Sequence, residues 1–93
     1  MSIGWAIISA GDFADSRGAP GINQAAGAEL VAVHSRDQGR SDAFAEKHSA
    51  KTAYTSVENV LSDSRIDAVY ITSPNHLHAE YTTMAANAGK HVL

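Results

Sequence analysis

Short apolar runs alternate with amphipathic stretches along the chain, and this alternation restricts the fold more than any other feature of the sequence. The apolar runs predict strands over residues 4–9, 29–35, 52–54, 67–72 and 91–93. The stretches between them predict helices over residues 13–26, 38–48, 55–61 and 74–88. A parallel neighbour needs a crossover connection, so strands that alternate with helices indicate parallel pairing. Because the runs are almost continuously apolar, both faces of the sheet should be covered, which predicts an α/β fold with flanking helices.

Cap and turn residues mark the ends of these helices. Gly18 and Pro20 weaken the first helix and predict a kink or an interruption within it. Thr55 and Glu58 stand three residues apart, the form of a capping box at the start of the third helix. Gly89 is placed to end the fourth helix.

Small residues fill the turn between the first strand and the first helix. The turn runs from Ser9 to Ala14 and matches the pattern G-x-G-x-x-G/A, except that Ser9 replaces the first glycine. In that pattern the first small residue permits a tight turn, Gly11 lets a pyrophosphate approach the backbone, and Ala14 lets the helix pack closely. The helix then directs its free amides at the phosphates. This predicts a Rossmann-type parallel sheet, containing the first βαβαβ half and the start of the second. The alternative is an ordinary strand-to-helix turn.

The end of the second predicted strand is where the ribose of a dinucleotide should lie. An NAD site has a carboxylate there, whereas this chain has Ser35 and Arg36, with Asp37 beyond the strand. A hydroxyl and a guanidinium would bind a 2′-phosphate that a carboxylate would repel. The sequence therefore predicts NADP in preference to NAD, with Arg40 as a further candidate. The alternative is that Arg36 is a solvated turn residue.

A second polar segment, from Thr72 to Asn75, ends the fourth predicted strand. Ligands of doubly wound sheets bind beyond the carboxyl ends of the strands, so this segment should border the pyrophosphate or the nicotinamide ribose. An ordinary helix start explains the same residue types equally well. His76 and His78 lie two residues apart on the next helix, face different ways and have no third ligand in sight, so no metal site is predicted. The other three histidines are isolated, and none is given a catalytic role.

Composition excludes several other classes of function. The 93 residues allow one domain, and the seven Lys and Arg are scattered in a chain of net charge −3. Nucleic-acid and anionic-membrane surfaces need clustered positive charge, so neither partner is expected. The absence of cysteine excludes disulfides and thiolate metal sites. With no signal peptide and no apolar run long enough to span a bilayer, a cytoplasmic location is expected.

Two motifs near the end of the chain resemble a known family. Residues 67–75 are followed, after a helix, by Gly89-Lys90-His91-Val92-Leu93. Together with the glycine turn, Ser35-Arg36 and residues 73–78, they make the whole chain similar to the N-terminal domain of the glucose–fructose oxidoreductase / inositol dehydrogenase / MocA family.

The resemblance implies an NAD(P)-dependent oxidoreductase that acts on a sugar, a polyol or a related hydroxyl or carbonyl compound. It implies the cofactor positions Ser9, Gly11, Asp12, Phe13, Ala14, Ser35, Arg36, Thr72, Ser73, Pro74 and Asn75. His78 matches a recurrent family histidine that is structural or borders the site.

No catalytic residue is implied within the chain. The family's catalytic lysine belongs to a Glu-Lys-Pro motif that would follow Leu93. We therefore expect residues 1–93 to be a truncated N-terminal NAD(P)-binding domain that is inactive alone. A substrate-binding domain, through which any homo-oligomer would form, is expected to be missing.

Two readings from other classes stay open. One is a non-catalytic module that binds a dinucleotide without using it. The other is a Rossmann-like domain for S-adenosylmethionine or coenzyme A, although Ser35-Arg36 disfavours the first of these ligands, which typically needs an acidic residue at that position.

Overall fold

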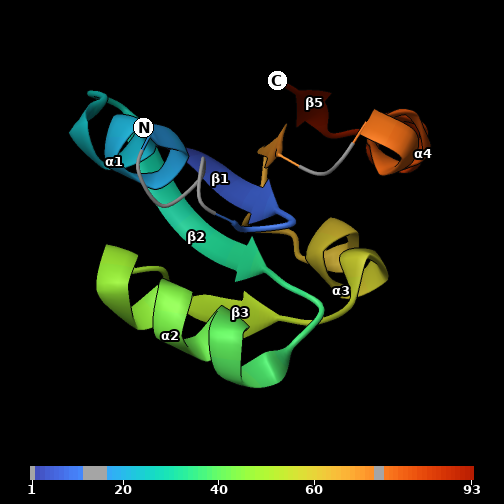
Figure 1. Cartoon of the computed structure of the whole chain (residues 1–93). Helices are drawn as coiled ribbons and strands as arrows, with labels where there is room; N and C mark the ends of the chain where they lie inside the picture. The colour runs from blue at the N-terminus through green and yellow to red at the C-terminus, as the bar shows by residue number, and fades with distance from the viewer. Residues whose placement is uncertain (1, 12–16, 73–74) are drawn as a thin grey trace.

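Five parallel strands form one sheet in the order β3-β2-β1-β4-β5, as the computed structural model shows (Figure 1). The structure describes residues 2–11, 17–72 and 75–93. Its strands are β1 (Ile3–Ile8), β2 (Ala28–His34), β3 (Thr52–Tyr54), β4 (Ala68–Ile71) and β5 (His91–Val92). Its helices are α1 (Ala19–Gln24), α2 (Gln38–His48), α3 (Val57–Ser62) and α4 (Asn75–Asn87). The chain builds outward from β1 in one direction to β3 and then crosses to the other side with β4, which is the strand order of a Rossmann-type sheet.

Helices cover both faces of the sheet, which explains why its strands are apolar without interruption. In Figure 1, α1 and α2 lie on one side of the sheet and α3 and α4 on the other. In β1, Ala6 and Ile8 join the cluster under α3 and α4, while Ile7 joins the cluster under α1 and α2. All three side chains are fully buried, so neighbouring residues of β1 pack into opposite halves of the core.

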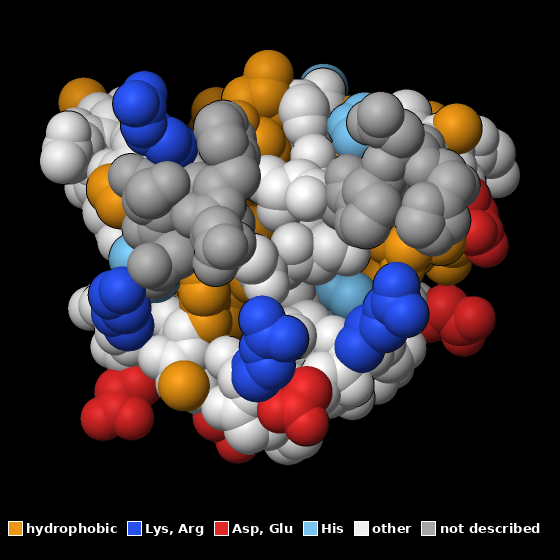
Figure 2. Space-filling model, in the orientation of Figure 1, with side chains coloured by type: hydrophobic (Ala, Val, Ile, Leu, Met, Phe, Trp, Pro, Cys, Tyr) orange, Lys and Arg blue, Asp and Glu red, His pale blue; other side chains and the backbone are white. Residues whose placement is uncertain are grey.

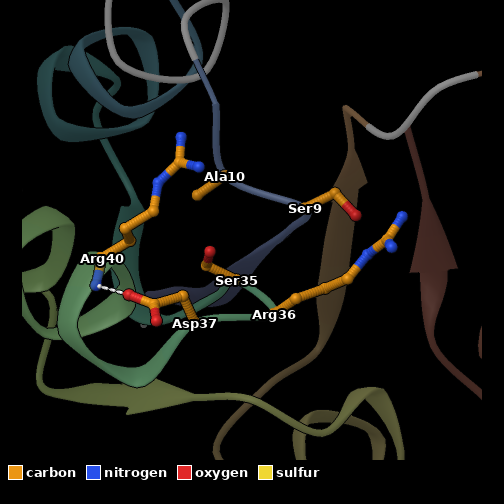
Figure 3. Close-up of a pocket in the computed structure, with 6 residues that line it drawn as sticks. All are labelled: Ser9, Ala10, Ser35, Arg36, Asp37 and Arg40. Carbon is orange, nitrogen blue, oxygen red and sulfur yellow. Dashed lines mark hydrogen bonds between the residues drawn. The ribbon is translucent and has the colours of Figure 1, made fainter.

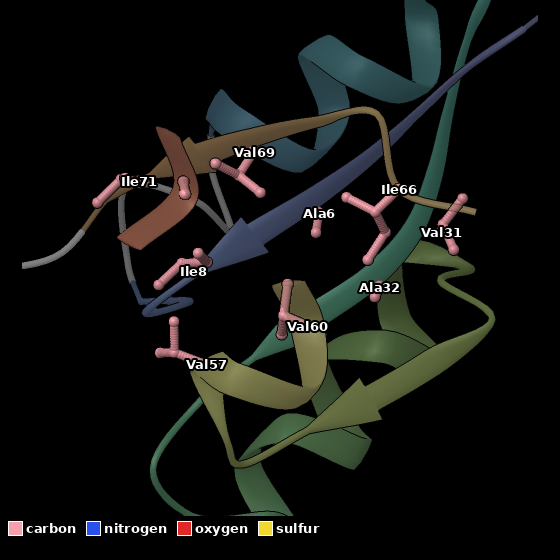
Figure 4. Packing of buried hydrophobic residues seen from close by; sticks show 10 residues of the cluster. Ala6, Ile8, Val31, Ala32, Val57, Val60, Ile66, Val69 and Ile71 are labelled. Carbon is pink, nitrogen blue, oxygen red and sulfur yellow. The ribbon is translucent and has the colours of Figure 1, made fainter. Parts of the chain in front are cut away.

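The larger core cluster lies between the sheet and α3 and α4. Figure 4 shows Val57 and Val60 of α3 pointing at the strand that carries Ala6 and Ile8. Its buried members are Ala6, Ile8, Val31, Ala32, Val57, Val60, Ile66, Val69, Ile71 and Ala85. The cluster contains residues of both β1 and β4, which pair with one another, so this packing helps to bring the carboxyl ends of the two strands side by side.

A β-bulge interrupts the pairing of β1 with β2. Trp5 pairs with Leu30 and Ala6 pairs with Ala32, which leaves Val31 as the extra residue. Gly4 lies next to the bulge, where a Cβ would collide with the carbonyl oxygen of Arg65 and approach the Val31 side chain. Glycine is therefore required at this point of β1 by the close approach of backbone, a constraint that the apolar pattern did not reveal.

The first helix ends two residues earlier than predicted. The prediction ran from residue 13 to residue 26, whereas α1 spans Ala19–Gln24 after a π-helical turn at residues 17–18. Pro20 lies in the first turn of α1, where its missing amide has no helical partner to lose. Gly27, with φ of 79°, provides the left-handed residue in the turn between α1 and β2. Residues 13–16 of the prediction lie outside the described residues.

The capping box was placed one residue too early. Ser56, not Thr55, caps α3, because the Ser56 hydroxyl accepts a hydrogen bond from the Asn59 amide at 3.3 Å. The Thr55 backbone instead hydrogen-bonds His34, a tertiary contact that no local pattern contains. The remaining helices and strands lie within one or two residues of their predicted limits. Within the described part of the chain, no helix has the length and apolar character that crossing a bilayer requires.

Candidate dinucleotide-binding site

The carboxyl ends of β1 and β2 border a pocket of about 440 Å³ (Figure 3). Its described lining consists of Ser9, Ala10, Ser35, Arg36, Asp37 and Arg40. These residues come from the turn after β1, from the end of β2 and from the first turn of α2. Parallel strands bring these segments together because their carboxyl ends meet at one edge of the sheet, which is where ligands of such folds bind.

Ser9 has a left-handed backbone conformation, with φ of 65°. Its amide donates to Nδ1 of His34 at 3.0 Å, and its carbonyl accepts from Oγ1 of Thr72 at 2.9 Å. The next amide, of Ala10, donates to the carbonyl of His34 at 2.7 Å. The turn is therefore tied to β2 on one side and to the end of β4 on the other. A left-handed conformation favours glycine, the residue that the G-x-G-x-x-G/A pattern has at this position.

Gly11 is not required by the packing of the described residues. A Cβ added there would meet only the Ser9 carbonyl oxygen among them, at 3.9 Å, and the backbone of Gly11 is not left-handed. A glycine that neither its own conformation nor its described neighbours demand is consistent with close approach of a ligand. The next residues of the motif, Asp12, Phe13 and Ala14, lie outside the described residues.

Two arginines flank the pocket. Figure 3 shows Arg36 and Arg40 extending on two sides of it, with the hydroxyl of Ser35 between them. Both arginines are exposed, whereas Ser35 is nearly buried and its amide donates to the Tyr54 carbonyl at 3.1 Å. Two guanidinium groups and a hydroxyl in one pocket offer several hydrogen-bond donors and positive charge, which suits a phosphate group.

Among the described residues of the pocket lining, Asp37 carries the one carboxylate, and this carboxylate has a structural partner. Oδ2 of Asp37 accepts from the Arg40 amide at 2.8 Å and so caps the N-terminus of α2. Arg40 thus lies in the first turn of α2 and lines the same pocket as Arg36, which precedes the cap. Arg40 was only a secondary candidate in the sequence, and Asp37 and Ala10 were not candidates at all. The spacing from Asp37 to the start of an amphipathic helix was the available signal for the cap.

Thr72, Asn75 and His78 are not among the described residues that line the pocket. Thr72 contacts the turn through Ser9, and Asn75 begins α4. His78 is exposed on α4, where its carbonyl accepts from Oγ1 of Thr82 at 2.8 Å. Ser73 and Pro74 lie outside the described residues. The structure thus brings Ser9, Ser35 and Arg36 into one pocket, and it connects Thr72 to that pocket by a hydrogen bond.

His34 is a buried polar residue behind the turn, with 2 % of its surface exposed. Burial lowers its pKa below 6.5, and the charge of Arg36 acts in the same direction, while a hydrogen bond to the Thr55 backbone opposes them. The sequence suggested no role for this histidine, because only the folded chain brings its ring to the Ser9 amide.

A family model described as "Oxidoreductase family, NAD-binding Rossmann fold" matches residues 3–93. The chain belongs to this family, GFO_IDH_MocA. Both the family resemblance and the Rossmann-type fold predicted from the sequence are thereby confirmed. The pocket lies at the carboxyl ends of β1 and β2 of this GFO_IDH_MocA domain.

Relatives in the GFO_IDH_MocA family include several oxidoreductases. An uncharacterized oxidoreductase of Rhizobium meliloti is 42 % identical over 94 % of this chain and 26 % of its own length. The D-xylose 1-dehydrogenase (NADP(+)) 2 of Haloferax volcanii is 47 % identical over 75 % of this chain and 22 % of its own length. A scyllo-inositol 2-dehydrogenase (NADP(+)) of Bacillus subtilis is 45 % identical over 70 % of this chain and 20 % of its own length.

A solved structure of the same architecture contains a dinucleotide. The 3-ketoreductase of Actinomadura kijaniata in complex with NADP superposes with a TM-score of 0.94 and 32 % identity, covering 100 % of this chain and 29 % of that one. The chain therefore spans about a quarter of the length of the proteins it matches.

Proposed function

We propose that this chain binds NADP(H) at the ends of β1 and β2, as the cofactor domain of an oxidoreductase. The reaction would transfer hydride between the nicotinamide and a sugar, a polyol or a related hydroxyl or carbonyl compound. The observation that carries the proposal is the pocket itself, which Ser35, Arg36 and Arg40 line together while the Asp37 carboxylate caps α2. Two relatives with NADP(+) in their names and a ketoreductase structure with NADP support the same cofactor.

The proposed cofactor contacts divide among three segments. The turn from Ser9 would receive the pyrophosphate, the end of β2 would receive the adenosine 2′-phosphate, and the start of α4 would border the nicotinamide side. The proposed residues are Ser9, Gly11, Asp12, Phe13, Ala14, Ser35, Arg36, Thr72, Ser73, Pro74, Asn75 and His78, with Arg40 added by the pocket. When bound, the cofactor supplies the hydride chemistry, and these residues hold and orient it. A cytoplasmic location and a sugar-like substrate belong to the same proposal.

Removal of the Arg36 guanidinium tests the preference for NADP(H). We expect Arg36→Ala to weaken NADPH binding by about tenfold or more, because a charge-assisted hydrogen bond to phosphate contributes about 1.5–3 kcal/mol. NADH binding should change little, since NADH lacks the 2′-phosphate. Titration of both cofactors, followed by nicotinamide fluorescence, measures the two affinities.

Lys51→Ala is the matched control, because Lys51 is an exposed cation that pairs with Glu29. Lys51 directly precedes β3, so it lies at the amino ends of the strands, whereas the pocket lies at their carboxyl ends. This variant should leave both affinities unchanged. Tighter binding of NADH than of NADPH in the unmodified protein, together with a harmless Arg36→Ala, would contradict the proposed cofactor preference.

A further inference from the structure

We propose that His34 is a positioning residue of the dinucleotide site: its neutral ring holds Ser9 in the left-handed conformation, and protonation of the ring weakens dinucleotide binding. This inference rests on the proposed function, because it describes how the pyrophosphate-binding turn is held. It extends that function by giving the site a dependence on pH that comes from a side chain outside the pocket lining.

The conformation of Ser9 needs partners to hold it. Serine disfavours the left-handed region, since its Cβ then crowds the backbone, and Ser9 is nonetheless found there with φ of 65°. The Ser9 amide donates to Nδ1 of His34 at 3.0 Å, and the Ser9 carbonyl accepts from Oγ1 of Thr72 at 2.9 Å. Both sides of one strained residue are thus bound, one by β2 and the other by the chain after β4. His34 also accepts the Ala10 amide on its own carbonyl, at 2.7 Å.

The ring of His34 is suited to this role only in its neutral form. Because Nδ1 accepts the Ser9 amide, the neutral ring carries its proton on Nε2, and the Thr55 carbonyl serves as the acceptor for the ring. The ring is buried, and the aromatic ring of Tyr81 from α4 packs edge-on against it at 6.4 Å between centroids. The contacts of the ring therefore select one tautomer.

The charged and titratable groups around the ring do not favour an imidazolium. Arg36, two residues further along the chain, carries positive charge and lowers the pKa of His34. Tyr81 on α4 packs edge-on against the ring, and the described contacts from the turn after β1 and from the segment after β3 are the Ser9 amide and the Thr55 backbone. Burial is the largest cause of the lowered pKa.

The direction of the pH effect follows from the acceptor. Protonation places a hydrogen on Nδ1, so the ring can no longer accept from the Ser9 amide, and two donors then face one another. The pKa of His34 lies below 6.5, so the contact is intact at neutral pH. It is lost as the pH falls through that lowered pKa, and the turn is then free to leave the geometry that receives the phosphates.

The first experiment compares NADP⁺ affinity at about pH 7.5 and about pH 5 in the protein and in His34→Asn, by calorimetry. The asparagine carbonyl oxygen can accept the Ser9 amide and does not titrate. The 2′-phosphate also titrates near pH 6, but it does so equally in both proteins. We expect comparable affinity at the higher pH, and an additional loss of about tenfold in the unmodified protein at the lower pH.

A second pair of variants separates positioning from general damage to the fold. His34→Leu removes the acceptor at every pH and should weaken NADP⁺ binding by about tenfold at neutral pH. Ser9→Gly should suppress that loss, since glycine adopts positive φ without help. The double variant should therefore bind about as well as Ser9→Gly alone, which a merely structural role of His34 would not produce.

The outcomes distinguish this inference from the proposed function. If the unmodified protein binds neither NADP⁺ nor NADPH at any pH, the proposed function fails. The contact is still tested without cofactor, because ¹⁵N chemical shifts report whether Nδ1 of His34 is an unprotonated acceptor at neutral pH. A protonated Nδ1 at neutral pH, an equal pH response in His34→Asn, or a double variant no better than His34→Leu would each overturn the role of His34.

Discussion

Single residues in the turn after β1 have different reasons for their identity. Ser9 occupies a left-handed position that glycine would fill more easily, and three hydrogen bonds on it and on Ala10 hold the turn. Gly11 has an ordinary conformation and open space among the described residues. Backbone geometry thus restricts the first position, where hydrogen bonds hold a serine, whereas glycine at the second position is best explained by the approach of the proposed ligand.

Gly11→Ala tests this distinction. We expect the free energy of unfolding to change by about 0.5 kcal/mol or less, because the new methyl group meets no described neighbour closely. NADPH affinity should fall by about tenfold or more, because the methyl group lies where the pyrophosphate would approach. Gly21→Ala is the control, since Gly21 lies in α1 with open space around it, and this variant should leave affinity unchanged. Unchanged NADPH binding by Gly11→Ala would contradict the proposed place of the pyrophosphate.

At the scale of elements, α2 connects the fold to the site. Its N-cap Asp37 and its residue Arg40 both line the pocket, and its buried Ser41 donates to the Tyr54 carbonyl at 2.9 Å. The helix is therefore tied to β3 by one residue while it presents its first turn to the pocket. The Asp37 cap has two effects. It stabilises the helix, and it engages in a hydrogen bond the carboxylate that lies next to the proposed site of the 2′-phosphate.

Asp37→Ala should lower the free energy of unfolding by about 1 kcal/mol, the usual cost of losing a side-chain cap. Chemical denaturation measures this change. Asp37→Ser should restore the stability, because serine also caps, and it would leave the described lining of the pocket without a carboxylate. Asp42→Ala is the control for charge on the same helix, since its exposed contact with Gln38 should contribute only about 0.2–0.5 kcal/mol. Equal stability of Asp37→Ala and the unmodified protein would show that the cap is not important.

At the scale of the whole molecule, one carboxylate joins several segments at the edge of the core. Asp63 accepts from the Tyr54 hydroxyl at 2.8 Å and from the Arg65 guanidinium at 2.6 and 3.0 Å. Its carbonyl accepts from Nζ of Lys90 at 3.0 Å, so the chain before β5 is tied to the same point. The Arg65 guanidinium is the largest cause that holds the pKa of Asp63 well below its usual range.

This lowered pKa predicts how stability depends on pH. A carboxylate with a depressed pKa in the folded state contributes stability that is fully present above its unfolded pKa of about 3.9 and is lost below it. Asp63→Asn should therefore be less stable than the unmodified protein at neutral pH, and the difference should shrink as the pH falls below about 4. Thermal unfolding across that range measures it. Glu58→Gln, on the exposed face of α3, is the control, and a difference for Asp63→Asn that stays constant with pH would argue against the mechanism.

On the face shown in Figure 2, the described Lys and Arg side chains stand apart from one another, with acidic side chains among them. This arrangement follows from a chain with seven cations and ten carboxylates in which neither sign is clustered. The positive charge of the described pocket lining therefore comes from two arginines only, Arg36 and Arg40, and not from a general basic surface.

The sequence by itself determined the parallel α/β fold, the family and most element limits, because apolar period, small turn residues and helix caps are local signals. Ser35 and Arg36 were also accessible to it, since they lie at a countable distance from the glycine turn. Only the tertiary structure decided that Ser9 is left-handed, that Arg40 joins Arg36, and that the His34 ring meets the Ser9 amide. These features arise where β1, β2 and β4 end side by side. Strand order and register, including the bulge at Val31, bring the ends of these strands together. Neither strand order nor register can be predicted from any one segment of the chain, because both depend on pairing between distant segments.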